Sequence, residues 1–186
     1  VGSITNYTFD QIEPWVNSIE RCGFNGDKAM LCYNIKADTI NELQRRNFII
    51  LCPNMTKEGD AEYSDPNFCI MLDRFVHLSY FLQSKKTQYR YLIATDVKDV
   101  VFQIDPTLFL SSHLGAKKSI VASSEGIMYK DETWGKNNMI LSFGEYAYNQ
   151  CQHNTIVNAG TMGGRFDVML DLFATIWQFC GRSPKW

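Results

Sequence analysis

The chain has 186 residues, of which 45% are hydrophobic and 20% are charged, a composition typical of one folded globular domain rather than a disordered segment. Its formal net charge of −2 argues against a nucleic-acid-binding surface, because such surfaces are strongly basic. No apolar run approaches the roughly 18 residues that a membrane-spanning helix needs. We therefore expect a soluble domain with no membrane span and no nucleic-acid partner, either complete or a fragment of a longer chain.

The cysteine pattern bears on the cellular compartment. The six cysteines include no C-x-x-C pair, and several lie in apolar surroundings, as Cys32 and Cys52 do. Free cysteine behaves as a small buried hydrophobe, so we expect neither a zinc site nor a disulfide framework and favour a cytoplasmic location. Two glycosylation sequons, at Asn6 and Asn54, keep the secretory lumen open as an alternative.

Strand-like and helical patterns alternate along the chain. Apolar β-branched segments predict strands at 2–5, 29–33, 48–52, 91–95, 119–123 and from 155 onward. Apolar residues at helical spacing predict helices around 12–19, 38–43, 71–82, 138–148 and 168–179. Asp10 and Glu13 are expected to form a capping box for the first helix. This alternation predicts βαβ units and therefore an α/β fold with a mostly parallel sheet.

The apolar strand at 91–95 ends in the acidic segment Asp96-Val97-Lys98-Asp99. Open α/β sheets bind ligands beyond the carboxyl ends of their strands. Two neighbouring carboxylates repel each other unless a cation lies between them, and oxygen ligands suit Mg²⁺ or Mn²⁺. The segment therefore indicates a metal that carries a phosphorylated substrate. The alternative is that Asp96 caps a turn and Asp99 pairs with a surface cation.

A second glycine-containing segment follows the strand that begins at Thr155. It reads Asn158-Ala159-Gly160 and is followed by a pair of glycines, which indicates backbone that approaches something closely. Asn158 could bind sugar hydroxyls and Gly160 could admit them. A turn is the alternative for both residues.

Three further side chains have two interpretations each. Arg74 could reach a phosphate or could pair with Asp73 or Glu58 on the helix face. Tyr7 could stack on a nucleotide base or pack into the core. Trp134 could form a platform for a sugar ring or be partly buried.

In this order the motifs resemble the GT-A fold of glycosyltransferases that use nucleotide sugars. The motifs that carry the resemblance are Thr5-Asn6-Tyr7, Arg74, Asp96-Val97-Lys98-Asp99 and Asn158-Ala159-Gly160. The chain is also similar to glycosyltransferases encoded by large algal viruses. The resemblance implies a single GT-A-like domain, with a nucleotide-sugar-binding half at 1–110 and an acceptor-side half at 111–186.

The resemblance also implies roles for these residues. Donor binding would involve Thr5, Asn6, Tyr7, Arg74, Asp96 and Asp99, with Mn²⁺ or Mg²⁺ as the cofactor. Sugar or acceptor binding would involve Asn158, Ala159, Gly160 and Trp134. The acidic motif has the spacing D-x-x-D instead of the family's D-x-D. Asp99 matches the second family aspartate and is the expected direct metal ligand, whereas Asp96 would contact the ribose or bind the metal through water.

An inverting glycosyltransferase also needs a carboxylate that takes the proton of the acceptor hydroxyl. Candidates are Glu125 and Asp131, with Glu132 beside them; a surface or capping role is the alternative. No feature of the sequence reports whether transfer inverts or retains the anomeric configuration.

The sequence thus predicts a metal-dependent hexosyltransferase that moves a sugar from a nucleotide-diphosphate donor, expected to be a UDP-sugar, to a glycan or glycoprotein acceptor. One alternative is a Mg²⁺-dependent phosphohydrolase. Such enzymes usually carry a nucleophilic aspartate on the first strand, where this chain has Thr5, Asn6 and Tyr7. The other alternative is a non-catalytic module that binds nucleotide sugars.

Overall fold

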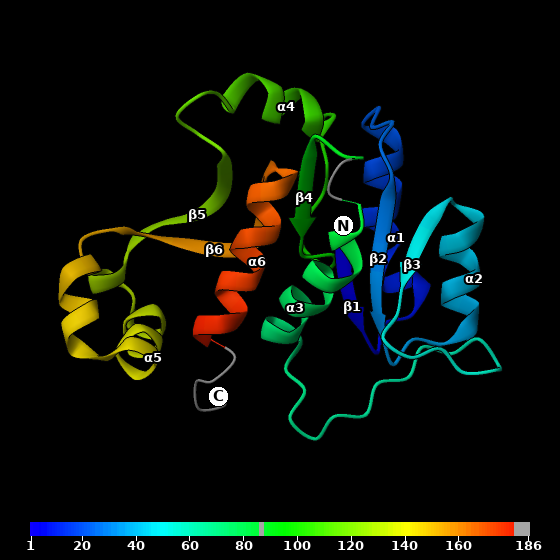
Figure 1. Cartoon of the computed structure of the whole chain (residues 1–186), viewed down its shortest axis with the longest axis horizontal. Coiled ribbons are helices and arrows are strands. Elements are labelled where there is room, and N and C mark those ends of the chain that lie inside the picture. Colours follow the sequence, from blue (N-terminus) through cyan, green and yellow to red (C-terminus); the bar gives the residue numbers. More distant parts are fainter. Residues whose placement is uncertain (86–87, 181–186) are drawn as a thin grey trace.

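The computed structural model describes residues 1–85 and 88–180, and its centre is a six-stranded sheet in the order β3-β2-β1-β4-β6-β5 (Figure 1). The strands are β1 (Gly2–Thr5), β2 (Lys28–Tyr33), β3 (Phe48–Leu51), β4 (Tyr91–Thr95), β5 (Ile120–Met128) and β6 (Thr155–Arg165). The helices are α1 (Phe9–Arg21), α2 (Ala37–Arg45), α3 (Ile70–Gln83), α4 (Pro106–His113), α5 (Thr133–Cys151) and α6 (Phe166–Cys180), with a 3₁₀ turn η1 (Tyr129–Asp131) before α5.

Strands β3, β2, β1 and β4 run parallel to one another, which confirms the predicted α/β class with a mostly parallel, Rossmann-like sheet. The other two strands make the sheet mixed. β6 is antiparallel to β4, with Leu92 opposite Gly164, and β5 is antiparallel to β6. The apolar pattern predicted strands at both positions but carries no information about their direction.

The core has two layers, one on each face of the sheet. In β2 the side chains alternate between them, as in any strand: Met30 and Cys32 face one layer, and Leu31 and Tyr33 face the other. The first layer is covered by α1 and α2, and the second by α3 and α6. Figure 1 shows α3 and α6 in front of the sheet. Because both faces of β2 are buried, its sequence is continuously apolar after Lys28.

The first helix begins differently from the prediction. Thr8, not Asp10, is its N-cap, and the Gln11 side chain accepts a hydrogen bond from the Thr8 backbone N–H at 2.9 Å. The predicted capping box of Asp10 and Glu13 is therefore wrong by two residues. Thr8 and Gln11 have the same three-residue spacing and supply the same reciprocal hydrogen bonding.

One end of the sheet extends well past the parallel strands. β4 pairs only with residues 161–165 of β6, so the segment 155–160 continues beyond the carboxyl end of β4. This extension, with β5 beside it, carries η1 and α5, which we call the α5 lobe (residues 129–151). Figure 1 shows α5 at one end of the molecule, apart from the other helices.

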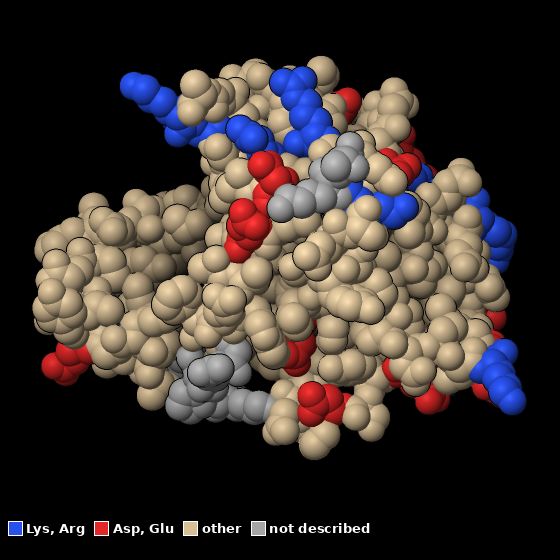
Figure 2. Space-filling model, in the orientation of Figure 1, with Lys and Arg blue, Asp and Glu red and all other residues tan. Residues whose placement is uncertain are grey.

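The α5 lobe differs from the body of the protein in its surface. Within α5 only Lys136 and Glu145 are charged, and the visible face of that end carries few charged side chains (Figure 2). The helix is longer than predicted and is bent at Gly144, whose φ is 82°. Only Gly135 and Tyr148 of α5 are buried.

No helix among residues 1–85 and 88–180 is both long enough and apolar enough to cross a bilayer. All six cysteines lie in the described ranges and are free thiols.

Candidate functional site

A cleft of about 700 Å³ opens where the carboxyl end of β4 meets the extension of β6. Its walls come from the first turn of α3, the segment that follows β4, the outer parts of β5 and β6, and α5. The cleft brings together eight of the residues predicted from the sequence: Arg74, Asp96, Asp99, Glu125, Trp134, Asn158, Ala159 and Gly160. These residues are up to 86 positions apart in the chain (160 − 74) and meet because α3, β4, β5, α5 and β6 all border this cleft.

An ion pair between Arg74 and Asp96 forms one wall of the cleft. Nη1 of Arg74 donates to Oδ1 of Asp96 at 2.6 Å, and only 8% of the arginine is exposed. Nε of Arg74 is buried and has no hydrogen-bond partner in the described chain. The predicted alternative partner Asp73 instead accepts from the Cys69 backbone N–H at 2.7 Å and so caps α3. Arg74 is thus a buried cation directed at the cleft.

The backbone of Asp96 is also fixed by a hydrogen bond. Its N–H donates to the carbonyl of Gly160 at 2.7 Å. A Cβ atom at Gly160 would lie 3.1 Å from Oδ2 of Asp96 and 3.1 Å from Oδ1 of Asn158. Any larger residue here would therefore require these two polar side chains to shift by a few tenths of an ångström, so the backbone at Gly160 approaches them closely, as the Asn158-Ala159-Gly160 segment indicated.

A second group of polar contacts lies on the other side of Gly160. Oδ1 of Asn158 accepts from the Gly160 N–H at 2.9 Å and from the hydroxyl of Ser123. Nδ2 of Asn158 donates to Oε1 of Glu125 at 2.7 Å. The two donors on Oδ1 determine which end of the amide faces Glu125. A strand residue of β6 therefore bridges two residues of β5.

The remaining wall of the cleft is apolar. Four lining side chains are large, hydrophobic and substantially exposed: Met71 at 60%, Trp134 at 71%, Phe143 at 46% and Val157 at 59%. Exposed apolar side chains that gather around one cleft are typical of a surface that binds a ligand or partner. The cleft thus combines a charged edge with an apolar wall.

The carboxylates of the cleft suit a metal that arrives with a phosphorylated substrate. Within the described ranges no group of three or more His, Cys, Asp or Glu side chains is close enough together to hold a metal ion. Mg²⁺ is usually bound through one or two carboxylates together with substrate phosphates and waters. Asp99, which is exposed, and Asp96 both line the cleft and carry oxygen atoms of the kind that such a cation binds. The donor set therefore fits a substrate-borne divalent cation.

Several predicted residues do not line this cleft. Thr5 is the last residue of β1, and Asn6 and Tyr7 follow it; β1 runs parallel to β4 and ends at the same edge of the sheet. Asn6 adopts a left-handed conformation with φ of 56°, and its N–H donates to the carbonyl of Tyr33 at 3.2 Å. Tyr7 packs against the core of the α1 and α2 face.

The candidate carboxylates Asp131 and Glu132 also have other positions. Asp131 is exposed in η1 and is not among the cleft-lining residues. Glu132 is the N-cap of α5, where its carboxylate accepts from the backbone N–H groups of Trp134, at 2.8 Å, and Gly135. Of the three carboxylates considered for taking the acceptor proton, Glu125 is the one that lines the cleft.

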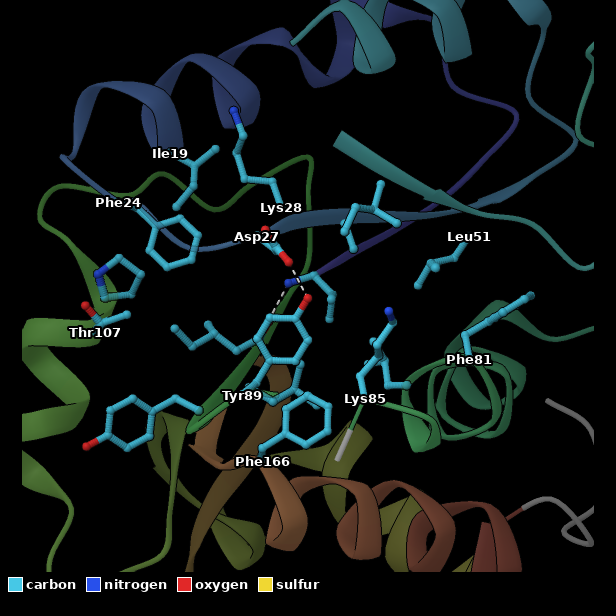
Figure 3. Close-up of a pocket in the computed structure, with 18 of the residues that line it drawn as sticks. Ile19, Phe24, Asp27, Lys28, Leu51, Phe81, Lys85, Tyr89, Thr107 and Phe166 are labelled. Carbon is cyan, nitrogen blue, oxygen red and sulfur yellow. Dashed lines mark hydrogen bonds between the residues drawn. The ribbon is translucent and has the colours of Figure 1, made fainter. Parts of the chain in front are cut away.

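A second hollow of about 130 Å³ lies at the opposite ends of the parallel strands, near the start of β2 and β4 (Figure 3). Figure 3 shows the ring of Tyr89 crossing it, with the hydroxyl directed at Asp27. The hydrogen bond to Asp27, together with burial, raises the pKa of Tyr89 to about 12. This hollow contains no residue predicted to act in function and is lined mainly by apolar side chains, so the polar cleft is the candidate site.

Sequence reasoning missed Ser123 and Tyr129, both of which line the cleft. For Ser123 a signal exists: it lies two residues before Glu125, and residues i and i+2 of a strand share a face. For Tyr129 we find no comparable signal.

Comparison with known proteins adds no family. A scan against protein-family models finds no match to this chain, and a search of curated proteins finds no significantly similar sequence.

Proposed function

We propose that this protein is a metal-dependent glycosyltransferase that moves a hexose from a nucleotide-diphosphate sugar, a UDP-sugar, to a glycan or glycoprotein acceptor. One observation carries the proposal. A buried arginine, an exposed carboxylate and a hydrogen-bonded asparagine–glutamate pair meet in one cleft, at the sheet edge where α/β proteins bind ligands.

The donor diphosphate is assigned to the charged edge of the cleft. Arg74 supplies a guanidinium whose cost of burial is already offset by Asp96, and an arginine fork matches phosphate oxygens. Arg74 and Met71 lie in the first turns of α3 and line the cleft, so the positive end of that helix dipole faces the same space. Both features favour a dianionic leaving group at this position.

Mn²⁺ or Mg²⁺ would be held by Asp99 and Asp96 together with the diphosphate. The ion would neutralise the negative charge that develops on the diphosphate oxygens as the leaving group departs. Arg74, which contacts Asp96 directly, would bind the phosphates beside these carboxylates. Its pairing with Asp96 keeps the guanidinium directed at the cleft before substrate arrives.

Glu125 is assigned to the acceptor. As the acceptor oxygen forms a bond to the anomeric carbon, its proton passes to the Glu125 carboxylate. The bond from the anomeric carbon to the diphosphate breaks, and its electron pair leaves with the diphosphate. Trp134, which is 71% exposed in the same cleft, offers a flat surface for the apolar face of a sugar ring.

Ligand-dependent stability tests the proposal directly. Thermal unfolding is measured with UDP, with Mn²⁺ and with both together. A ligand at 100 times its Kd stabilises the folded state by about 2.7 kcal/mol, so UDP with Mn²⁺ should raise Tm by several degrees. Turnover of a panel of UDP-sugars then identifies the donor.

Two aspartate substitutions separate a specific site from general charge effects. Asp99→Asn should abolish the Mn²⁺-dependent part of the shift, because it removes a charged ligand from the cleft. Asp171→Asn, which neutralises an exposed residue of α6 that does not line the cleft, should leave the shift unchanged. No response of the wild type to UDP, with or without Mn²⁺, would reject the proposal. Binding of UDP-sugar without turnover would indicate the non-catalytic module instead.

A further inference from the structure

The geometry points to a positioning role for Asn158 and Ser123: we infer that they hold the Glu125 carboxylate in place for proton transfer, rather than binding a sugar themselves. This inference rests on the proposed function, in which Glu125 takes the acceptor proton. It assigns Asn158 a role different from the sugar binding that the family resemblance implies. It also gives a role to Ser123, for which the sequence analysis predicted none.

The hydrogen-bonding capacity of Asn158 is largely used within the protein. A side-chain amide has an oxygen with two lone pairs and a nitrogen with two hydrogens. Both lone pairs of Oδ1 are engaged, by the Gly160 N–H at 2.9 Å and by the hydroxyl of Ser123. One Nδ2 hydrogen is donated to Glu125 at 2.7 Å. A sugar hydroxyl could reach only the one hydrogen that is left.

Glu125 needs an external support because its own strand does not supply one. The pairing of β5 with β6 shifts register between Ala122 and Ser124 and again between Ser124 and Met128. Gly126, the next residue, has a φ of 70°. The backbone around Glu125 is therefore outside a regular ladder, and an exposed glutamate at such a position would otherwise sample several rotamers.

Asn158 provides that support from the neighbouring strand β6. It binds Oε1 of Glu125, whereas Oε2 takes part in no hydrogen bond with any described residue. One carboxylate oxygen is thus fixed and the other is available to an acceptor hydroxyl. Ser123, two residues before Glu125 on β5, binds the opposite end of the same amide and prevents it from flipping.

The contacts of Asn158 also link Glu125, on the acceptor side of the cleft, to Asp96, on the donor side. Gly160 donates its N–H to Asn158 and accepts, through its carbonyl, the N–H of Asp96. The donor-side carboxylate and the acceptor-side carboxylate are therefore attached to one short segment of β6. A fixed separation between reacting groups is a main source of catalytic rate.

A double-mutant cycle tests the inference through activity. Asn158→Ala should lower kcat by on the order of 10²-fold, the lower end of what a positioned base contributes, and leave the KM for the donor unchanged. In the Glu125→Gln background the same substitution should have almost no further effect, because Asn158 acts through Glu125. Asn158→Asp should be no better than Asn158→Ala, since it keeps the acceptor for Gly160 but places an anion against Glu125. Additive losses with a raised donor KM, or full activity of Asn158→Asp, would overturn the inference.

A second measurement does not depend on activity. The side-chain amide of Asn158 is observed by ¹⁵N NMR in the substrate-free protein. Glu125→Ala should shift its resonance and accelerate its exchange with solvent, because the acceptor is removed. Asp131→Ala, a matched loss of a nearby exposed carboxylate, should change neither. If Glu125→Ala leaves the Asn158 amide unchanged, the inference is overturned. If the wild type turns over no nucleotide sugar, the proposed function is rejected, but the NMR test of the Asn158–Glu125 contact is unaffected.

Discussion

In the ion pair of Arg74 and Asp96, the buried guanidinium depends on the neighbouring carboxylate to balance its charge. The arginine side chain is 10% exposed and the aspartate side chain 39%, so the guanidinium depends on its partner more than the carboxylate does. Removal of one member of such a pair leaves a charge that is poorly solvated, and this costs more than the pair itself contributes. The pair therefore links the stability of the fold to the geometry of the cleft.

Asp96→Ala should lower the free energy of unfolding by about 1–3 kcal/mol, because Arg74 is left without its partner. Adding Arg74→Met, which removes the charge but keeps a long side chain, should restore much of that loss. Urea unfolding of the three variants measures both effects. Asp99→Ala is the control: this exposed residue makes no ion pair within the described chain, and its loss should change stability by less than about 0.5 kcal/mol. Equal losses for Asp96→Ala and Asp99→Ala would contradict the argument.

A second residue-scale prediction concerns pH. His77 accepts or donates at Nδ1 in a 2.7 Å hydrogen bond with the hydroxyl of Tyr33. Burial lowers the pKa of His77 below its ordinary value of 6.5, and the nearby Asp73 carboxylate opposes this shift only in part. The unfolded chain therefore binds this proton more tightly than the folded protein. The stabilising effect of a neutral His77 is present above pH 6.5 and is lost as the pH falls below it.

The free energy of unfolding should thus decrease between pH 7.5 and 5.5 more steeply in the wild type than in His77→Gln. Glutamine keeps a partner for Tyr33 but does not titrate. Chemical denaturation at several pH values measures the difference. His153→Gln, the same substitution at an exposed histidine, serves as the control. Parallel curves for the wild type and His77→Gln would show that His77 does not contribute.

At the scale of single elements, α5 depends on one glycine. Gly144 has φ of 82° and ψ of 165°, a region of backbone conformation that is essentially restricted to glycine. An added Cβ would meet nothing within 4 Å, so any effect of Gly144→Ala comes from the backbone alone. We expect Gly144→Ala to destabilise this part of α5 by about 1–3 kcal/mol, and the helical turns that follow the bend to fray as a result.

Hydrogen exchange of residues 145–151 measures that cost. Their amides should exchange faster in Gly144→Ala than in the wild type. Gly115→Ala provides a matched comparison, because a Cβ there also meets nothing within 4 Å but the backbone is not in the left-handed region. If α5 keeps its protection in Gly144→Ala, the bend is not a requirement of the fold.

The elements also show what a sequence can and cannot predict. Ile12, Val16 and Ile19 have helical spacing because they face one core, and all three are buried in α1 as that spacing predicted. The positions of the strands followed from equally local patterns. The direction of β6 and the bulges of β5 did not, because both depend on which strand lies alongside. The contact of Arg74 with Asp96, 22 residues away, was not predicted for the same reason.

For the candidate site, the types of residue were predictable and their partners were not. The sequence indicated Asp96, Asp99, Asn158 and Glu125 as polar groups near strand ends, and the structure places all four in one cleft. It did not indicate that Asn158 contacts Glu125, since that contact requires β5 to lie beside β6. Glu132 shows the converse: a carboxylate considered for catalysis caps a helix whose starting residue the sequence misplaced.

At the scale of the whole molecule, the protein divides into a buried sheet and an appended lobe. The sheet has helices on both faces and holds both core layers, with residues such as Phe173, Leu43 and Ile4 fully buried. The α5 lobe is attached through the outer parts of β5 and β6, and several of its large apolar side chains, among them Trp134, Leu141 and Phe143, remain exposed. Local stability follows the number of buried contacts, so the two parts should open with different free energies.

Native-state hydrogen exchange should resolve this difference. Amides of β1, β2 and β4 should exchange only through global unfolding, whereas those of α5 should exchange through local opening at rates at least about 100-fold higher. The cleft lies between these two parts, so a ligand that contacts both should protect α5 selectively. UDP-sugar with Mn²⁺ should therefore slow exchange in α5 and leave exchange in β2 nearly unchanged. Equal exchange rates in α5 and β2 without ligand would mean that the α5 lobe unfolds together with the sheet. In that case α5 would be a fixed wall of the cleft, and ligand binding would not stabilise it selectively.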